Sequence, residues 1–112
     1  MKSNLSRGVV ILVMICSSLT LFSCKKDATA GPGEVFIKDD LFSPSSITVS
    51  KGSSVTWTNK GSNTHTVTSD DALFDSGDKT PGQTYTLVFD SIGTFPYHCM
   101  HHSVMHGSVK VE

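Results

Sequence analysis

Hydrophobic and polar positions alternate in short runs along most of this chain. Val55 and Trp57 lie two positions apart, and Phe95, Tyr97 and Cys99 repeat the same spacing. Successive side chains of a β-strand point to opposite faces, so the residues of one such series share a face. No stretch after the first 33 residues repeats with the period of a helix. The pattern therefore indicates β-strands, with Trp57, Phe95 and Tyr97 in the core.

Seven strands are predicted, each followed by residues that favour turns. Gly, Pro, Asn and Asp stand between the apolar runs, as in Lys51-Gly52 and Ile92-Gly93, and they tolerate the backbone angles that turns require. Closely spaced strands of this kind are typical of a β-sandwich, so the chain is predicted to be all-β. The predicted strands are Glu34–Lys38, Ser46–Ser50, Ser54–Asn59, His65–Ser69, Thr84–Asp90, Gly93–Cys99 and Ser108–Glu112.

The start of the chain has a different pattern, that of a secretory signal. Lys2 and Arg7 give it a positive charge, and Val9–Met14 is an unbroken apolar run that continues, mostly apolar, to Phe22. This apolar stretch of about 14 residues is shorter than the roughly 20 that a membrane-spanning helix needs. We therefore expect the chain to be exported from the cytoplasm.

The signal ends at Leu21-Phe22-Ser23-Cys24, which resembles the lipobox of bacterial lipoproteins. The alternatives are an ordinary cleaved signal, or an uncleaved anchor in which Cys24 has no role. The residues that follow are small, polar and rich in Gly and Pro, as in a flexible tether. We therefore expect a lipoprotein signal peptide at 1–23, a lipidated tether at 24–33 and one folded domain at 34–112.

The cysteines suggest that one thiol has a specific use. The chain has three cysteines. Cys16 would leave with the signal and Cys24 would carry lipid, so only Cys99 would remain in the folded domain, without a disulfide partner. A single thiol in an oxidising compartment needs protection or a function. Cys99 is therefore expected to bind a ligand.

Charge argues against nucleic acid as a partner. The whole chain has a net charge of −1, and the predicted domain has five lysines and nine acids, which gives −4. Phosphate binding favours basic surfaces instead. Four of the acids form an acidic stretch that is expected to be a solvated loop, with docking of a basic partner as the alternative. They are Asp70, Asp71, Asp75 and Asp78.

The most informative motif is C-x2-H-x2-M, formed by Cys99, His102 and Met105, with His65 34 residues before the cysteine. One thiolate, two imidazoles and a thioether form the soft donor set of a mononuclear copper site with a weak axial methionine. Since the next predicted strand begins at Ser108, we expect His102 and Met105 on a short loop that wraps around one ion. A neighbouring strand would supply His65.

Each of these residues also has a simpler explanation. Cys99 could be a small buried hydrophobe, Met105 could fill the core, and His65 could be a hydrogen-bonded interior histidine. His101 competes with His102 as the second imidazole. Three further histidines lie beside the motif and receive no role from the sequence: His98, His101 and His106.

Segments along nearly the whole domain resemble the cupredoxins, most closely their plastocyanin and amicyanin branch. The resemblance implies an all-β Greek-key β-sandwich of about seven to eight strands. It also implies that His65, Cys99, His102 and Met105 bind one copper ion and that Thr66 braces the ligand loop through a hydrogen bond. The segments are Ile47-Thr48-Val49, Val55-Thr56-Trp57-Thr58-Asn59, His65-Thr66-Val67-Thr68-Ser69, Gly93-Thr94-Phe95-Pro96-Tyr97-His98-Cys99 and Gly107-Ser108-Val109-Lys110-Val111.

The expected function is that of a mononuclear type 1 (blue) copper protein that carries single electrons between redox partners in the cell envelope. A transient partner, such as a cytochrome c or an oxidoreductase, is expected to contact an apolar rim of Met100, Val104 and Met105. We expect a monomer anchored to a membrane through lipid on Cys24. We do not expect an enzyme, because the closed ligand set leaves no open position for a substrate. The alternative is a copper-trafficking or storage protein, which the surplus of histidine and methionine suggests.

Overall fold

The computed structural model describes residues 30–112, which contain eight strands and no helix. The predicted signal peptide, Cys24 and most of the predicted tether lie outside the described residues. Within the described part, no helix is long and apolar enough to cross a membrane. The strands are β1 (Glu34–Ile37), β2 (Phe42–Ser43), β3 (Ser46–Val49), β4 (Ser53–Asn59), β5 (Thr68–Ser69), β6 (Thr84–Phe89), β7 (Gly93–Cys99) and β8 (His102–Val111).

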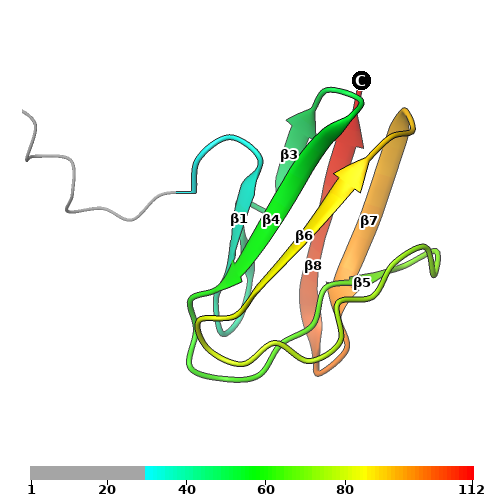
Figure 1. The fold of residues 1–112 in the computed structure, drawn as a ribbon. Helices are drawn as coiled ribbons and strands as arrows, with labels where there is room; N and C mark the ends of the chain where they lie inside the picture. Colours follow the sequence, from blue (N-terminus) through cyan, green and yellow to red (C-terminus); the bar gives the residue numbers. More distant parts are fainter. Residues whose placement is uncertain (1–29) are drawn as a thin grey trace, which may run out of the picture.

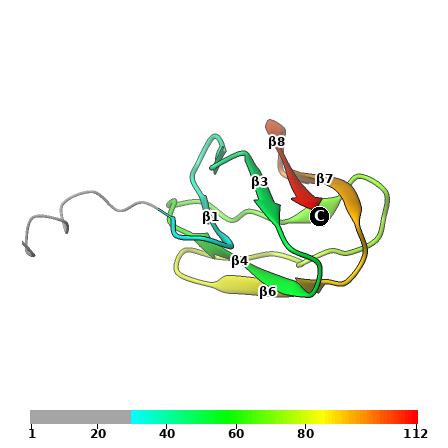
Figure 2. The same cartoon turned by 90° about the horizontal axis from the view of Figure 1, so that it is seen from above.

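The strands form two four-stranded sheets that pack face to face (Figures 1 and 2). One sheet has the order β2-β1-β4-β6, and the other has the order β3-β8-β7-β5. β1 is parallel to β4 and β3 is parallel to β8, whereas the other neighbouring strands are antiparallel. The predicted all-β sandwich is confirmed. β2 was not predicted, because a strand of two residues is too short to show alternation.

Alternation along the strands places large side chains between the sheets, with Trp57 of β4 at the centre. The ring centroid of Trp57 lies 5.7 Å from that of Tyr85 on the neighbouring strand β6 and 5.4 Å from that of Tyr97 on the opposite sheet. Burial of a large apolar side chain stabilises a fold by about 1.5–3 kcal/mol. The buried apolar residues are Val35, Ile37, Phe42, Val55, Trp57, Val67, Phe89, Tyr97, Cys99, Met105, Val109 and Val111.

Tyr97 is packed so closely that its neighbour across the sheet has to be glycine. β7 and β8 place Tyr97 opposite Gly107, and a Cβ atom on Gly107 would overlap the tyrosine ring. In the described part of the chain, the hydroxyl of Tyr97 and Nε1 of Trp57 are both buried without a hydrogen-bond partner. Burial raises the pKa of Tyr97 to about 12, because the phenolate is disfavoured away from water.

His65 lies in an extended segment outside the sheet, although the sequence pattern predicts a strand over His65–Ser69. The strand β5 comprises only the last two residues of that range and pairs with β7. The N–H groups of His65 and Lys79 each donate to the carbonyl of the other, at 3.0 and 2.8 Å. His65 is therefore positioned by pairing with the loop between β5 and β6.

The prediction that His102 and Met105 lie on a connecting loop is wrong. β8 begins at His102 and includes Met105, and only Met100 and His101 form the turn between β7 and β8. The register between these strands shifts through a bulge next to Cys99. The early part of β8 has exposed apolar and polar side chains in mixed order, so the alternation that reveals a strand is lost there.

Candidate metal site

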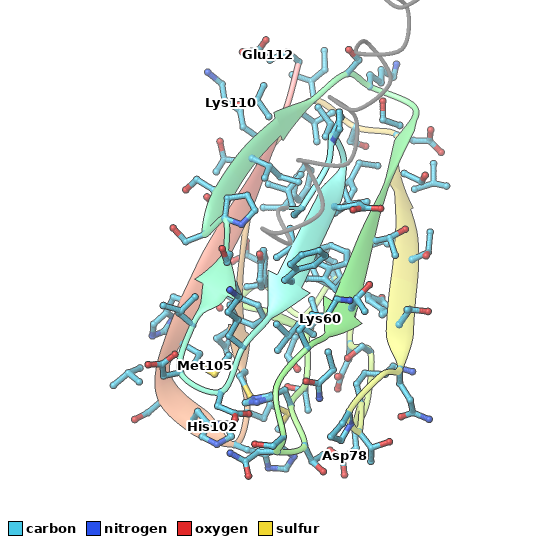
Figure 3. All side chains as sticks on the ribbon, turned by 90° about the vertical axis from the view of Figure 1, so that its left-hand side faces the viewer. Lys60, Asp78, His102, Met105, Lys110 and Glu112 are labelled. Atoms are coloured by element: carbon cyan, nitrogen blue, oxygen red, sulfur yellow. The ribbon has the colours of Figure 1, made fainter. Side chains whose placement is uncertain are left out.

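The predicted ligands come together at the end of the sandwich opposite the C-terminus. Cys99 ends β7 and His102 begins β8, on the two sides of a tight turn. His65 reaches the same place from the segment between β4 and β5. Figure 3 shows His102 and Met105 at this end and Glu112 at the other. We call the first the site end and the second the terminal end.

The thiol of Cys99 lies beside both imidazoles. Its Sγ is 3.4 Å from Nδ1 of His102 and 3.7 Å from Nδ1 of His65. One donor atom from each of the three residues lies within 4.8 Å of the other two. Cys99 and His65 are buried, whereas His102 is partly exposed. Both rings therefore present Nδ1 to a common point next to the sulfur.

This spacing fits one first-row transition-metal ion. Bonds of about 2.3 Å to sulfur and about 2.0 Å to nitrogen require sulfur-to-nitrogen separations of roughly 3.5–3.8 Å in trigonal or tetrahedral geometry. The observed separations are 3.4 and 3.7 Å. One thiolate and two imidazoles suit copper, whereas magnesium and calcium prefer oxygen ligands. The donor set therefore matches a copper site.

Met105, the fourth predicted ligand, has a fully buried side chain on β8. Figure 3 shows it just above His102, at the site end. A buried thioether in this position is compatible with a weak axial ligand. The same side chain also fills the core between the sheets, so its role as a ligand stays a prediction.

Asp39, between β1 and β2, is a site residue that the sequence pattern does not reveal. Its Oδ1 lies 3.2 Å from Nε2 of His65. This hydrogen bond assigns the ring proton to Nε2 and leaves the lone pair of Nδ1 facing Cys99. A carboxylate on the outer nitrogen fixes the orientation of a ligating histidine and raises its basicity. Asp39 therefore prepares His65 to bind a metal ion.

Several donors hold the carboxylate of Asp39 in place. Ser62 donates its N–H at 2.8 Å and its hydroxyl at 2.7 Å, and Asn63 donates its N–H at 3.0 Å. The Ser62 hydroxyl, the His65 ring and the Asn63 N–H keep the pKa of Asp39 well below its ordinary value, because each stabilises the charged form. Since Asp39 lies 26 positions before His65, no local motif could have revealed the pair.

Thr66 holds both Cys99 and the turn that follows it. Its backbone N–H donates to Sγ of Cys99 at 3.4 Å, and its Oγ1 accepts the N–H of Met100 at 2.9 Å. The N–H group fixes the position of the sulfur, which binds metal as the thiolate. The expectation that Thr66 braces the ligand turn is confirmed.

Asn59, at the end of β4, positions the loop that carries His65. The asparagine is 1% exposed. Its Nδ2 donates to the carbonyls of Asn63 and Lys79, at 2.9 and 2.8 Å, and its Oδ1 accepts the N–H of Gly61 at 2.8 Å. One side chain thus ties together two loops at the site end. The sequence pattern places Asn59 at the end of a predicted strand but gives it no role at the site.

Three more histidines lie close to the ligands but contact other oxygen atoms. Nδ1 of His98 is hydrogen-bonded to Oδ1 of Asp70, and Nε2 of His101 lies 2.8 Å from Oδ1 of Asp78. Nε2 of His106 lies 3.0 Å from a backbone carbonyl oxygen. The acidic stretch is therefore more than a solvated loop, because two of its carboxylates contact histidines beside the ligands.

The predicted apolar rim is smaller than expected. Met100 and Val104 are 62% and 77% exposed, whereas Met105 is fully buried. Including Met105 in the rim was wrong, because β8 turns this side chain inward. The exposed apolar surface next to the partly exposed His102 is formed by Met100 and Val104.

A β-sandwich with a buried thiol and two imidazoles grouped at one end has the architecture and donor set of a mononuclear copper protein. A family model described as a cupredoxin-like domain matches residues 9–111. The chain therefore belongs to the cupredoxin-like family. This confirms the resemblance drawn from the sequence and, together with the donor set, confirms one copper ion as the cofactor.

Named relatives and solved structures agree with this assignment. The chain is 35% identical over 100 residues to amicyanin-alpha from Methylorubrum extorquens, which covers 78% of this chain and 77% of that one. It is 32% identical over 85 residues to plastocyanin from Scenedesmus fuscus, which covers 64% and 87%. A purple cupredoxin from Nitrosopumilus maritimus superposes with a TM-score of 0.67 and 28% identity, over 70% of this chain and 98% of that one.

Proposed function

We propose that this protein is a mononuclear type 1 copper protein that carries single electrons between redox partners. The observation that carries the proposal is the grouping of Cys99 Sγ with Nδ1 of His65 and of His102 in a braced, largely buried cluster. When bound there, copper supplies a reversible one-electron change. The residues we assign as ligands are His65, Cys99, His102 and Met105.

The chain's own contribution to this function is to hold the ligands still. Asp39 fixes the ring of His65, and Thr66 directs its N–H at the sulfur of Cys99. A site that keeps one geometry needs little reorganisation when its charge changes. Because His102 is partly exposed, electrons would enter and leave beside it, where the exposed side chains of Met100 and Val104 offer a small surface for transient contact. These features support an electron carrier rather than an enzyme.

The direct test is the visible absorption spectrum of the copper-loaded protein. An intense thiolate-to-copper band that disappears in Cys99→Ser is expected. His102→Gln should also abolish or strongly change the band, whereas His101→Gln is the matched control and should leave it unchanged. A colourless copper complex would contradict the electron-carrier proposal.

The second candidate function is copper trafficking or storage. The observation that favours it is the set of additional imidazoles beside the ligands, on His98, His101 and His106. A trafficking protein should lose its copper readily to a competing chelator and lack the intense band. Retention of copper and of the band in the presence of the chelator would rule this function out.

We further infer that the chain works outside the cytoplasm as a lipoprotein. The support is the charged and apolar start of the sequence and the segment Leu21-Phe22-Ser23-Cys24. On this proposal residues 1–23 are removed, 24–33 form the lipidated tether, and 34–112 form the domain. In cells supplied with labelled palmitate the protein should incorporate the label, and Cys24→Ser should abolish the incorporation. Incorporation that persists in this variant, or none in the unmodified protein, would contradict lipidation.

We also propose that the protein is a monomer that meets its redox partner only transiently. Light scattering of the copper-loaded protein in detergent-free buffer, with the lipid site removed by Cys24→Ser, should give the mass of one chain. A stable dimer would require a different account of how partners reach His102.

A further inference from the structure

A surface hollow of about 530 Å³ lies at the site end, on the outside of the β7–β8 pair. Most of the residues that line the hollow have no role in the proposed function. Cys99 is one of the residues that line the hollow, so the hollow lies next to the buried cluster. Its lining residues are Asp70, His98, Cys99, Met100, Ser103 and His106.

Two histidines stand opposite one another in this lining. The antiparallel register of β7 and β8 pairs His98 with His106, and their ring centroids are 6.4 Å apart. Directly opposed residues on one face of a sheet have Cβ atoms about 4.5–5.5 Å apart. Imidazoles on such positions can therefore each direct one nitrogen to a common ion.

Within residues 30–112, the contacts of the two rings leave one nitrogen free on each. Asp70 occupies Nδ1 of His98, so Nε2 of that ring is available. The carbonyl of Ser103 occupies Nε2 of His106, so Nδ1 of that ring is available. A carboxylate on the far nitrogen orients a metal-binding imidazole, and the contact between Asp39 and His65 at the buried cluster is of the same kind.

Met100, whose side chain carries a soft thioether donor, also lines the hollow. Imidazole and thioether ligands favour copper over magnesium, calcium and manganese, which prefer oxygen. Asp70 also supplies a negative charge beside the rings, and His98 is only partly exposed. The chemistry of the hollow therefore suits a copper ion that remains accessible to solvent.

We propose that His98 and His106, with Met100 nearby and Asp70 orienting His98, form a second, exposed copper site that passes copper to the buried ligands. This inference rests on the proposed function, since it supplies the ion for that site. Copper keeps its oxidation state during the transfer. It exchanges the exposed imidazoles for Cys99, His65 and His102, and the proton of the Cys99 thiol leaves to solvent.

Stoichiometry of the full-length protein tests the site itself. After titration with Cu(II) and gel filtration, the unmodified protein should retain two copper ions per chain, and His106→Gln should retain one. His98→Gln is the second variant and should give the same result. A single retained ion in the unmodified protein would overturn the proposal.

His101→Gln is the matched control, because His101 also pairs with a carboxylate, that of Asp78, but lies outside the hollow. This variant should retain two ions. If it loses the second ion as completely as His106→Gln does, non-specific surface binding is the explanation and the proposed site is wrong.

The rate at which the copper-free protein develops its visible band tests the transfer. With one equivalent of Cu(II), loading of His106→Gln should be at least several-fold slower, with the same final band, whereas His101→Gln should load at the unmodified rate. Equal rates in all three proteins would overturn transfer through the hollow. A band missing from all three would instead contradict the proposed function, and the count of retained ions would still decide whether the exposed site exists.

Discussion

Backbone hydrogen bonds close both ends of this sandwich, but only at the site end do buried or half-buried polar side chains add several more. At the terminal end, short turns close through the backbone: Gly52 N–H donates to the carbonyl of Phe89 at 2.7 Å, and Lys51 N–H donates to that of Glu112 at 2.9 Å. At the site end, side chains do much of this work, since Asn59 and Asp39 each bind several backbone groups of the loops.

Loop length is the physical reason for the difference. Strands joined by a few residues satisfy their backbone groups across the sheet. In contrast, none of the eight described strands runs beside the long segments before and after β5 for much of their length. Their polar backbone groups need other partners when they are buried. The side chains of Asn59 and Asp39 bind some of these groups and, together with the backbone pairing of His65 with Lys79, hold His65 in one position.

The largest expected effect comes from removing the most connected of these side chains. Asn59→Ala deletes three hydrogen bonds and leaves the carbonyls of Asn63 and Lys79 without these donors. The free energy of unfolding should fall by about 3 kcal/mol, at roughly 1 kcal/mol for each bond. Urea denaturation measures this loss, and the exposed side chain of Asn63 provides the control. Asn63→Ala should change stability by less than about 0.5 kcal/mol, and a similar loss in both variants would contradict the special role of Asn59.

Metal binding should strengthen the site end by a comparable amount. With free copper a hundredfold above its dissociation constant, the free energy of unfolding should rise by about 2.7 kcal/mol, because the folded state alone assembles the ligands. Thermal unfolding with and without copper measures the rise. Cys99→Ser should lose most of it, and an unchanged melting temperature of the unmodified protein would count against a preformed site.

A smaller effect is expected when Asp39 loses its negative charge but keeps nearly the same side-chain shape. Asp39→Asn keeps an oxygen acceptor for the ring of His65 but removes the negative charge beside it. Copper affinity should fall by roughly 10–100-fold, as measured by competition with a chelator. Asp40→Asn, at an exposed neighbouring position, is the control and should leave the affinity unchanged; equal losses would point to overall charge instead.

Between the two ends, Tyr97 has a buried hydroxyl with no hydrogen-bond partner among residues 30–112. Tyr97→Phe removes an unsatisfied hydroxyl and should stabilise the protein by about 1 kcal/mol at neutral pH. The raised pKa, about 12 in the folded protein against about 10 for a free tyrosine, means that folding favours the neutral phenol. This stability is present below pH 10 and is lost as the pH rises toward 12.

The variant should therefore lose less stability between pH 10 and 12 than the unmodified protein does. Urea denaturation at a series of alkaline pH values measures the difference. Parallel losses in the two proteins would show that Tyr97 does not ionise on unfolding in this range.

The smallest effect is expected at the terminal end. Nζ of Lys110 lies 3.3 Å from Oε2 of Glu112, and both side chains are more than half exposed. Figure 3 shows the pair at the end opposite His102. Lys110→Ala should change the free energy of unfolding by less than about 0.5 kcal/mol, because water and salt screen exposed ion pairs. A loss comparable with that of Asn59→Ala would remove the contrast between the ends.

Several features were predictable because they depend on residues close together in the sequence. Alternation placed Trp57 and Tyr97 in the core, and the spacing from Cys99 to His102 identified two members of the metal cluster. Strand boundaries were less predictable where tertiary contacts decide them. The segment of His65 leaves the sheet to pair with Lys79, and β8 extends back to His102 across a bulge.

By itself, the sequence determined the all-β class, the inward faces of the main strands and the identity of the clustered donors. These follow from side-chain alternation and from donor chemistry, which act over a few residues. Only the tertiary structure decided that Asp39 meets His65 and that His98 meets His106. Such contacts depend on strand register and loop path, and many residue pairs of the same chemistry lie equally far apart in the chain without ever touching.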